Sequence, residues 1–280
     1  MAEKALVLKK EKLIQHLKGL NSVLVAFSGG VDSTFLLAVS HQVLGDRAVA
    51  ATADSFTYPS REREEAIEFT RKRGISHIVF QSDESDDPDF LANNPERCYF
   101  CKMSLSRKLL EIASEKRLAH VAHATNCDDL GDYRPGLRAA NEMGMIAPLL
   151  EAGINKEEIR FLSKEMGLPT WDKPAMACLA SRIPYGDPIT EKKLRMIEDA
   201  ESFLQKNGFS QYRVRFHGNT ARIEVEPSEI EMIIDQDLKK KIIAKFKDIG
   251  FLHIAVDLEG YVTGSLNRGI GIDVEIDNCK

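Results

Sequence analysis

The stretch from Val23 to Val39 constrains the fold more than any other part of the sequence. Its apolar run, Val23–Phe27, leads directly into Ser28-Gly29-Gly30-Val31-Asp32-Ser33-Thr34, after which the apolar spacing is that of a helix. A strand that becomes a helix through two glycines presents backbone N–H groups and the positive end of the helix to an anion. We therefore expect a phosphate-binding turn in an α/β fold. An ordinary glycine-rich turn, in which Asp32 only favours the helix start, is the alternative.

The residues of this turn suit a nucleotide. Gly29 and Gly30 let the backbone approach phosphate closely, because neither has a side chain. Ser28 and Ser33 supply hydroxyl donors, and Asp32 is placed to hold Mg²⁺ or to orient the loop. The pattern is not a Walker A loop, since no lysine precedes its serine. It resembles the PP-loop of the N-type ATP pyrophosphatases, which cleave ATP between its α and β phosphates.

The first 175 residues alternate between apolar runs and helical patterns. Besides the first strand, we predict strands over 48–53, 75–81 and 119–125 and helices over 60–73 and 155–166. This alternation predicts a doubly wound parallel sheet, in which ligands bind beyond the carboxyl ends of the strands. Residues 82–96 are acidic and without periodicity, so we expect a mobile lid or a disordered loop there.

The character of the sequence changes after Trp171. A turn-rich stretch is followed by a predicted helix, a hairpin with Gly218-Asn219 as its loop, a second helix and a last strand, over 190–206, 212–226, 228–247 and 252–258. We therefore predict two domains. Residues 1–175 form the domain that carries the PP-loop, and residues 176–280 form a linker and a smaller α+β domain.

Composition narrows the classes of function. There is no run of about 18 apolar residues, and charged residues interrupt the N-terminal stretch, so we expect a cytoplasmic protein with no membrane partner. A formal net charge of −5 gives no general affinity for polyanions, and we expect no nucleic-acid partner. Five cysteines, an odd number, do not suggest a disulfide framework and favour metal or catalytic roles.

Cys98 and Cys101 form a C-x-x-C pair just before a predicted helix. Zinc sites, iron–sulfur clusters and redox dithiols all use this spacing. The remaining cysteines are Cys127, Cys178 and Cys279, and we expect no role for the last of them. Three thiolate ligands would leave one metal position open, which favours a reactive site over a structural one.

Polar groups follow two of the predicted strands. The backbone near Ala53 ends one strand, where it would contact an adenine. Thr125-Asn126-Cys127-Asp128-Asp129 ends another, and its amide and carboxylate groups suit contacts with nucleotide and Mg²⁺. An Asx-rich turn, in which an aspartate only caps a helix, is the alternative.

The hairpin predicts a second charged site. A tight loop at Gly218-Asn219 would place Arg215 opposite Arg222. In the same register Arg213 faces Glu224. Because directly opposed arginines repel each other, we expect an anion between them, and guanidinium groups suit phosphate or carboxylate. A solvated charged strand face is the alternative.

Six segments together resemble the LarE family of ATP-dependent sulfur transferases. They are Ser28–Ser33, Thr125–Asp129, Asp132–Gly136, Ser181–Gly186, Arg213–His217 and Ala221–Glu224, and they span nearly the whole chain. The resemblance implies a role in building the nickel-pincer nucleotide cofactor of lactate racemase. In this family, each carboxylate of pyridinium-3,5-dicarboxylate mononucleotide is adenylylated by ATP and converted to a thiocarboxylate, with AMP and pyrophosphate as the other products.

The resemblance also implies the source of sulfur. Cys178 matches the family's sulfur-bearing cysteine, which becomes dehydroalanine in members that have that cysteine alone. This chain also has Cys98 and Cys101, as in members whose three cysteines hold a [4Fe-4S] cluster with an extra sulfide. Sulfide or a cysteine desulfurase would then supply the sulfur. Members form hexamers, so the resemblance also implies a homo-oligomer.

The candidate residues follow from these motifs and from the resemblance. The catalytic candidates are Cys178 and Asp32. ATP contacts are expected at Ala26, Phe27, Ser28, Gly29, Gly30, Asp32, Ser33, Ala53, Thr125 and Asn126. The resemblance implies substrate or phosphate contacts at Lys102, Arg134, Ser181, Arg182, Arg213 and Arg215. The expected cofactors are ATP, Mg²⁺ and a [4Fe-4S] cluster, with Asp128 and Glu224 as candidate ligands of the divalent cation.

Two other functions fit parts of the sequence. A PP-loop tRNA thiolase also combines cysteines with this loop, but it would need a basic RNA-binding surface, which the acidic composition does not favour. A non-catalytic nucleotide-binding protein with a structural zinc would use the same loop and the same cysteine pair. Release of pyrophosphate distinguishes an enzyme from such a sensor.

Overall fold

The computed structural model describes residues 2–131, 135–174 and 177–262. These residues form two compact units. Unit 1 comprises residues 2–90 and 96–174, and unit 2 comprises residues 91–95 and 177–262. Each unit contains its own sheet. In the described part of the chain, no helix combines the length and the apolar character needed to cross a membrane.

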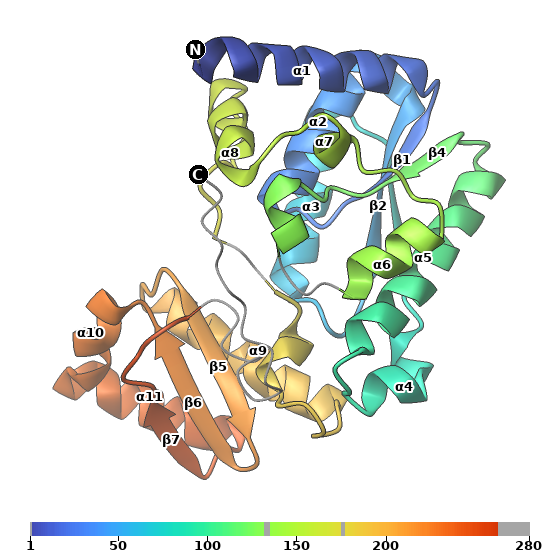
Figure 1. Ribbon diagram of the computed structural model, residues 1–280. Coiled ribbons are helices and arrows are strands. Elements are labelled where there is room, and N and C mark those ends of the chain that lie inside the picture. Colours follow the sequence, from blue (N-terminus) through green and yellow to red (C-terminus); the bar gives the residue numbers. More distant parts are fainter. Residues whose placement is uncertain (1, 132–134, 175–176, 263–280) are drawn as a thin grey trace. The chain divides into compact units, whose positions relative to one another are not determined.

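Unit 1 is built on a four-stranded parallel sheet (Figure 1). The strands are β1 (Val23–Ala26), β2 (Ala48–Asp54), β3 (His77–Gln81) and β4 (His120–Ala122), in the order β3-β2-β1-β4. Leu24 of β1 pairs with Val49 on one side and with Val121 on the other. The chain runs from β1 outward through β2 to β3 and then returns to place β4 on the other side of β1. Such a reversal of strand order creates a crevice at the carboxyl ends of β1 and β4. The predicted doubly wound α/β fold is confirmed.

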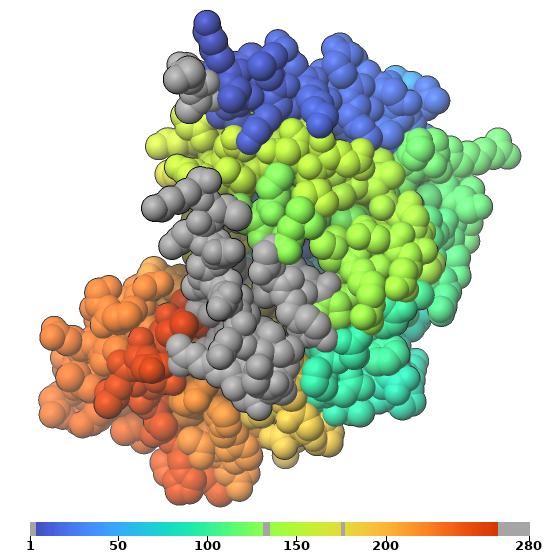
Figure 2. Space-filling view, in the orientation of Figure 1, coloured from blue at the N-terminus to red at the C-terminus, as the bar shows by residue number. Residues whose placement is uncertain are grey.

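Helices cover both faces of this sheet. One face carries α1 (Ala2–Gly19), α2 (Val31–Leu44), α3 (Ser60–Arg73), α7 (Pro148–Glu151) and α8 (Lys156–Glu165). The other face carries α5 (Arg97–Glu115) and α6 (Pro135–Glu142). Residues of β1 alternate accordingly, with Val23 and Val25 in the first core and Leu24 in the second. In Figure 2 the blue atoms of α1 lie against the yellow-green atoms of α8, where Lys9 pairs with Glu158 at 2.7 Å.

Residues 82–96 are more ordered than their sequence suggests. They contain a short turn of 3₁₀ helix (Glu84–Asp86) and α4 (Pro88–Leu91). Asn93 is fully buried in unit 2, where its side-chain amide donates to the carbonyl oxygens of Pro184 at 2.7 Å and Asp187 at 2.8 Å. The expected lid or disordered loop is therefore wrong for this segment. The N–H groups of Gly186 and Ile189 also donate to backbone carbonyls of this segment. Contacts of this kind leave no periodic signal in the sequence.

Unit 2 combines a small mixed sheet with three helices. Strands β5 (Tyr212–His217) and β6 (Thr220–Val225) are antiparallel, and β7 (His253–Val256) runs parallel to β6. The helices are α9 (Glu191–Lys206), α10 (Ile230–Ile234) and α11 (Gln236–Ile249). The hairpin has the predicted register. The single helix predicted over 228–247 is wrong, because Asp235 is extended and its carboxylate caps the start of α11.

Candidate functional site

The turn between β1 and α2 is held in shape by its own residues. Gly30 is the residue before α2, and its extended backbone leaves the first N–H groups of the helix without helical partners. The hydroxyls of Ser28 and Ser33 lie 3.1 Å apart, and the Ser33 hydroxyl donates to the carbonyl oxygen of Gly30 at 3.2 Å. Gly29 has a φ of +72°, and a Cβ there would lie 3.2 Å from Cβ of Ala66. Only glycine suits this position.

Asp32 lies in the first turn of α2, as predicted, and pairs with a lysine from a distant helix. Its Oδ2 accepts a hydrogen bond from Nζ of Lys156, the first residue of α8, at 2.6 Å. Burial raises the pKa of the Asp32 carboxyl above its usual value, and Asp129 adds to the increase, although the Lys156 ammonium opposes it. Among the described residues Oδ1 is buried and accepts no hydrogen bond. Asp32 thus has one oxygen available to a ligand.

The residues after β4 form a compact Asx turn near Asp32. Asn126 is buried, its side chain accepts the N–H of Asp128 at 2.9 Å, and its own N–H donates to Asp129 Oδ2 at 2.9 Å. Asp128 Oδ2 in turn accepts the N–H of Lys156 at 2.8 Å. These residues do form an Asx turn, and it holds Asp129 close enough to raise the pKa of Asp32. The cation role expected for Asp128 stays a prediction.

Three other candidate contacts have backbone or ring partners in unit 1. The N–H of Phe27 donates to the carbonyl of Ala51 at 2.8 Å, and its own carbonyl accepts the Thr52 hydroxyl at 2.6 Å. The ring of Phe27 is buried in the core, so its backbone has limited freedom to contact ATP. Ala26 ends β1, Ala53 is the last residue but one of β2, and both are half-buried. All three stay predictions as ATP contacts.

His123 was not predicted and lies at the carboxyl end of β4. Its Nδ1 is 2.7 Å from the Thr125 hydroxyl, and in the described structure its buried Nε2 has no hydrogen-bond partner. Burial lowers the pKa of His123 to about 4, and the nearby charge of Lys102 contributes. Lys102 and Thr125, two predicted contacts, are thereby linked through a neutral imidazole.

The C-x-x-C pair lies in the first turn of α5 rather than before the helix. Cys98 is exposed and Cys101 is half-buried, and neither is in a disulfide. Their spacing of three residues places both thiols on one side of the helix. Gly136 packs directly on this turn, since a Cβ at that position would lie 3.3 Å from the carbonyl oxygen of Cys98. The Pro135-Gly136 part of the recognised motif therefore supports the cysteine turn.

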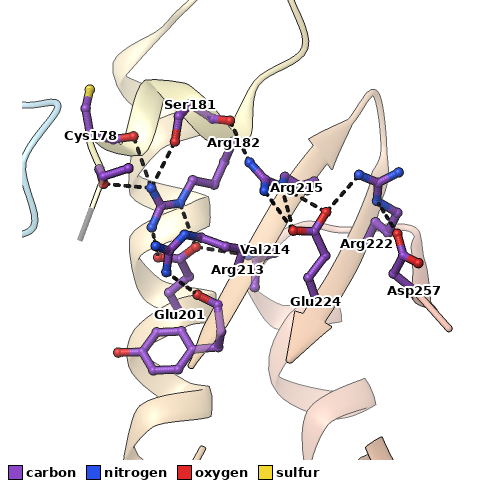
Figure 3. A network of polar contacts seen from close by, with 12 residues as sticks. Cys178, Ser181, Arg182, Glu201, Arg213, Val214, Arg215, Arg222, Glu224 and Asp257 are labelled. Carbon is purple, nitrogen blue, oxygen red and sulfur yellow. Dashed lines mark hydrogen bonds and ion pairs between the residues drawn. The ribbon is translucent and has the colours of Figure 1, made fainter. Parts of the chain in front are cut away.

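Unit 2 contains a buried arginine that holds the backbone of Cys178 (Figure 3). Arg182 is fully buried, and its guanidinium pairs with Glu201, at 2.8 Å from Nε to Oε1 and 3.0 Å from Nη2 to Oε2. Its Nη1 donates to the carbonyl oxygens of Ala177 at 2.7 Å and Cys178 at 3.1 Å. Glu201 also accepts the N–H of Val214. This network fixes the backbone on which the Cys178 thiol is carried.

Arg213 and Arg215 of the hairpin are buried, whereas the Arg222 side chain is 37% exposed, so the solvated-face alternative is wrong for the first two. Arg213 is 3% exposed and Arg215 is 6% exposed. The anion expected between Arg215 and Arg222 is the protein's own Glu224, whose Oε2 lies 2.7 Å from Arg215 Nη2 and whose Oε1 lies 2.8 Å from Arg222 Nη2. The role of Glu224 as a ligand of a divalent cation stays a prediction. Binding a cation there would require the guanidinium groups of Arg215 and Arg222 to move away from its carboxylate.

Two further contacts link the hairpin to the Cys178 segment. Arg215 Nη1 donates to the carbonyl oxygen of Ser181 at 2.9 Å, and the Ser181 hydroxyl accepts from Arg182 at 3.1 Å. Burial lowers the pKa of Arg213, and the charge of Arg182 adds to this effect. The predicted contacts Ser181, Arg182, Arg213 and Arg215 therefore form one cluster within unit 2 (Figure 3).

Some of the predicted residues belong to different units or lie outside the described residues. Cys98 and Cys101 belong to unit 1, whereas Cys178 belongs to unit 2. Within the residues that the structure describes, no three His, Cys, Asp or Glu side chains are grouped so as to hold a metal ion. Arg134 and Cys279 lie outside the described residues. The cluster and the phosphate contacts therefore stay predictions.

The sequence reasoning missed Lys156, Lys173 and Glu201. Lys156 and Lys173 pair with residues more than 100 positions away, and nothing local marks either lysine. Glu201 does carry a signal. It falls on the buried stripe of α9 with Leu194, Ile197 and Leu204, and a charge at such a position indicates a buried partner.

Comparison with known proteins gives near full-length relatives. An uncharacterised protein of Synechocystis sp. is 44% identical over 260 residues, which cover 93% of this chain and 97% of that protein. The pyridinium-3,5-bisthiocarboxylic acid mononucleotide synthase of Lactiplantibacillus plantarum is 34% identical over 264 residues, which cover 94% of this chain and 95% of the synthase. Models of protein families give no match.

A more distant similarity concerns the part of the chain that carries the PP-loop. One of the polypeptides of the glutamine-hydrolysing GMP synthase of Methanocaldococcus jannaschii is 26% identical over 210 residues, covering 65% of this chain and 63% of that polypeptide. Together with the parallel sheet and the glycine turn, this similarity supports the PP-loop superfamily. The chain belongs to the LarE family, within the superfamily of PP-loop ATP pyrophosphatases.

Proposed function

We propose that this protein is an ATP-dependent sulfur transferase that converts a carboxylate of pyridinium-3,5-dicarboxylate mononucleotide to a thiocarboxylate, a step in building the nickel-pincer cofactor. The observation that carries the proposal is the match, over nearly the full length of both chains, to a synthase whose product is the corresponding bisthiocarboxylic acid. That product differs from the dicarboxylate by the replacement of carboxylate oxygen with sulfur. The reaction therefore needs an activated carboxylate and a sulfur nucleophile.

Activation explains why the chain has a PP-loop. A free carboxylate is a poor acyl acceptor because its leaving group would be oxide. Attack of a carboxylate oxygen on the α-phosphate of ATP releases pyrophosphate and forms an acyl-adenylate, from which AMP leaves readily. The N–H groups at the start of α2 and the hydroxyls of Ser28 and Ser33 would bind the departing pyrophosphate.

The residues at the PP-loop fit a divalent cation. Asp32 Oδ1 is a buried acceptor with no hydrogen bond among the described residues, and the Asx turn with Asp128 and Asp129 adds carboxylates nearby. Asp32 would hold Mg²⁺, with Asp128 as a candidate second ligand. When bound, the ion would offset negative charge on the pyrophosphate leaving group. Lys156 opposes the increase that burial causes in the pKa of Asp32, and its hydrogen bond orients the carboxylate for this role.

Sulfur transfer is assigned to the cysteines. The thiol of Cys178 sits on backbone fixed by Arg182, while Cys98 and Cys101 present two thiols from one turn of α5. These three cysteines would hold the [4Fe-4S] cluster, which when bound would supply sulfide as the nucleophile. A thiolate or sulfide attacks at neutral pH without a dedicated base. In the sacrificial alternative the Cys178 sulfur itself is transferred, and dehydroalanine is left.

The acceptor needs an anion site for its phosphate and second carboxylate. Arg213 and Arg215, with Ser181 and Arg182, form a buried cationic cluster next to the Cys178 segment in unit 2. Guanidinium groups recognise phosphate and carboxylate through paired hydrogen bonds. Lys102, which lies near His123 in unit 1, would contribute a further phosphate contact. Arg134, at a position that matches the family motif, would contribute another substrate contact. The family resemblance also implies a homo-oligomer, with a hexamer as the expected form.

The proposal is tested by product analysis under anaerobic conditions. The protein is reconstituted with iron and sulfide and incubated with MgATP and pyridinium-3,5-dicarboxylate mononucleotide. The masses of the products are then measured by mass spectrometry. The expected result is a gain of about 16 Da per carboxylate, the mass difference between sulfur and oxygen, with loss of this product in Cys178→Ala. An acceptor that gains AMP but never sulfur would contradict the sulfur-transfer step.

The same samples distinguish the two sources of sulfur. A brown wild-type protein with about four iron atoms per chain, bleached by Cys98→Ala and by Cys178→Ala, supports the cluster. Loss of mass at Cys178 corresponding to dehydroalanine supports the sacrificial route. A colourless protein with stoichiometric zinc and no pyrophosphate release would indicate the nucleotide-binding alternative.

A further inference from the structure

Lys173 lies beside the nucleotide turn, although no recognised motif includes it. Its Nζ donates to the carbonyl oxygen of Gly29 at 3.3 Å. The same ammonium lies 2.6 Å from Oε2 of Glu62 and 2.9 Å from Oε2 of Glu65, both on α3. The side chain of Lys173 is only 14% exposed. One buried cation therefore joins the backbone of the turn to two carboxylates.

These carboxylates lie on the helix that packs against the turn. A Cβ at Gly29 would lie 3.2 Å from Cβ of Ala66 and 3.5 Å from the carbonyl oxygen of Glu62. The Glu62 side chain is 10% exposed. A buried carboxylate next to an anion-binding turn disfavours the binding of a triphosphate, because like charges repel strongly where solvent is excluded. The nucleotide turn therefore needs a compensating cation at this point.

The hydrogen bond to Gly29 has a second effect. In a trans peptide the C=O and the following N–H point in opposite directions. An ammonium that holds the Gly29 carbonyl on the α3 side therefore directs the N–H of Gly30 to the opposite side. There it donates to the hydroxyl of Ser28 at 3.4 Å, one of the groups expected to contact phosphate.

We propose that Lys173 is a positioning residue for ATP: it neutralises Glu62 beside the PP-loop and orients the Gly29–Gly30 peptide toward the triphosphate. This inference rests on the proposed function, because it takes the turn to be the ATP site. Lys173, near the end of unit 1, would thus contribute to ATP binding although it lies outside the PP-loop motif.

The backbone of Lys173 is itself fixed by α8. Arg160 donates to the carbonyl oxygen of Trp171 at 2.7 Å and to that of Lys173 at 2.9 Å. The Lys164 ammonium lies 4.4 Å from the centre of the Trp171 ring. Since α8 also supplies Lys156 to Asp32, this one helix helps to position two cations at the turn.

The two carboxylates differ in how much they depend on Lys173. Glu65 also accepts a hydrogen bond from Nε of Arg61 at 2.6 Å. Burial raises the pKa of Glu65, but the hydrogen bonds and charges of Lys173 and Arg61 together bring it below its usual value. Glu65 thus keeps a cation when Lys173 is removed. Glu62 loses the ammonium at 2.6 Å, so its charge is the one to neutralise in a rescue experiment.

The test is titration calorimetry with MgATP on the full chain. Lys173→Met is expected to raise the Kd for ATP at least about tenfold, and Lys173→Met/Glu62→Gln to recover most of that loss, because the uncompensated charge is gone. Glu62→Gln alone is expected to bind ATP at least as tightly as the wild type, which tests the charge argument even if Lys173→Met does not fold. Lys72→Met, which removes the same charge from an exposed pair with Glu68 on α3, is the control and should leave the Kd unchanged.

The outcomes separate this inference from the proposed function. Wild-type protein that does not bind ATP would overturn both. Tight ATP binding by Lys173→Met, no recovery in the double variant, or weaker binding by Glu62→Gln would overturn only the role of Lys173.

Discussion

The nucleotide turn of unit 1 and the arginine cluster of unit 2 are both charged sites, but their charges are balanced differently. The turn consists mainly of backbone groups and short side chains, and in the described structure Asp32 keeps one oxygen without a hydrogen bond. In the arginine cluster, Arg182 and Arg215 already pair with Glu201 and Glu224 inside the protein. The turn thus keeps an acceptor without a partner in the described structure, whereas these two arginines are paired within the folded core.

This difference predicts opposite responses to mutation. Removing a polar group from the turn should cost activity and little stability, since its protein partners, such as Lys156 for Asp32, are partly exposed to solvent. Removing one member of a buried ion pair leaves the other charge uncompensated, so the cluster should lose stability first. Each substitution below tests one side of this contrast.

The largest effect is expected for Arg182→Met in unit 2. The substitution leaves Glu201 buried without its bidentate partner, and the cost should be about 3–5 kcal/mol in the free energy of unfolding of this unit. Hydrogen exchange of the amides of α9 and β5 under increasing urea measures it. Arg182→Met/Glu201→Leu should recover part of the loss. Unchanged exchange in the single variant would show that the pair contributes little, and the contrast would fail.

Asp32→Ala should act on activity instead. Loss of the carboxylate that would hold Mg²⁺ at the leaving pyrophosphate should slow pyrophosphate release about 100-fold or more. Because burial raises the pKa of Asp32, its removal should change the unfolding of unit 1 by less than about 1 kcal/mol. Asp46→Ala, an exposed aspartate of the same unit, is the control. A variant that unfolds but keeps its specific activity would reverse this prediction.

His123 is a buried titratable group of unit 1. Its pKa is about 4 in the folded state, against about 6.5 when unfolded, so the unfolded chain binds a proton first as the pH falls. Stability should therefore be unaffected above pH 7 and decrease from about pH 6.5 down to about pH 4. Relative to His123→Gln, the wild type should lose roughly 2 kcal/mol between pH 7 and pH 5. If the free energy of unfolding changed with pH in the same way in both proteins, the burial of neutral His123 would be contradicted.

The smallest effect is expected for Arg213→Gln. A charge-assisted hydrogen bond contributes about 1.5–3 kcal/mol, so the variant should bind the pyridinium dicarboxylate nucleotide about tenfold more weakly or worse. ATP affinity should not change. Calorimetric titrations with each ligand measure the two constants. Equal loss for both ligands would mean that the substitution disturbs the whole protein, and no loss for either would remove Arg213 from the acceptor site.

The contrast also explains what the sequence could predict. The parallel sheet, the glycine turn and the place of Asp32 follow from local spacing, because consecutive residues determine a strand-to-helix turn. The hairpin register was equally local, since a two-residue loop fixes which residues face each other.

The partners of these residues were not predictable in the same way. Lys156 reaches Asp32 across 124 positions of sequence, and Glu224 occupies the place where an external anion was expected. The anchoring of residues 82–96 through Asn93 depends on contacts 90 and more residues away. Such pairings arise from the tertiary fold, so the local spacing of residues does not predict them.

The central claim, that the turn of unit 1 activates a carboxylate with ATP, is tested most directly by following the fate of the phosphates in a single turnover. The protein is mixed with MgATP labelled at the γ position, with and without pyridinium-3,5-dicarboxylate mononucleotide, and the labelled product is separated. The account predicts labelled pyrophosphate, stimulated by the acceptor and accompanied by AMP or an acyl-adenylate. Labelled inorganic phosphate with ADP as the sole products would contradict it.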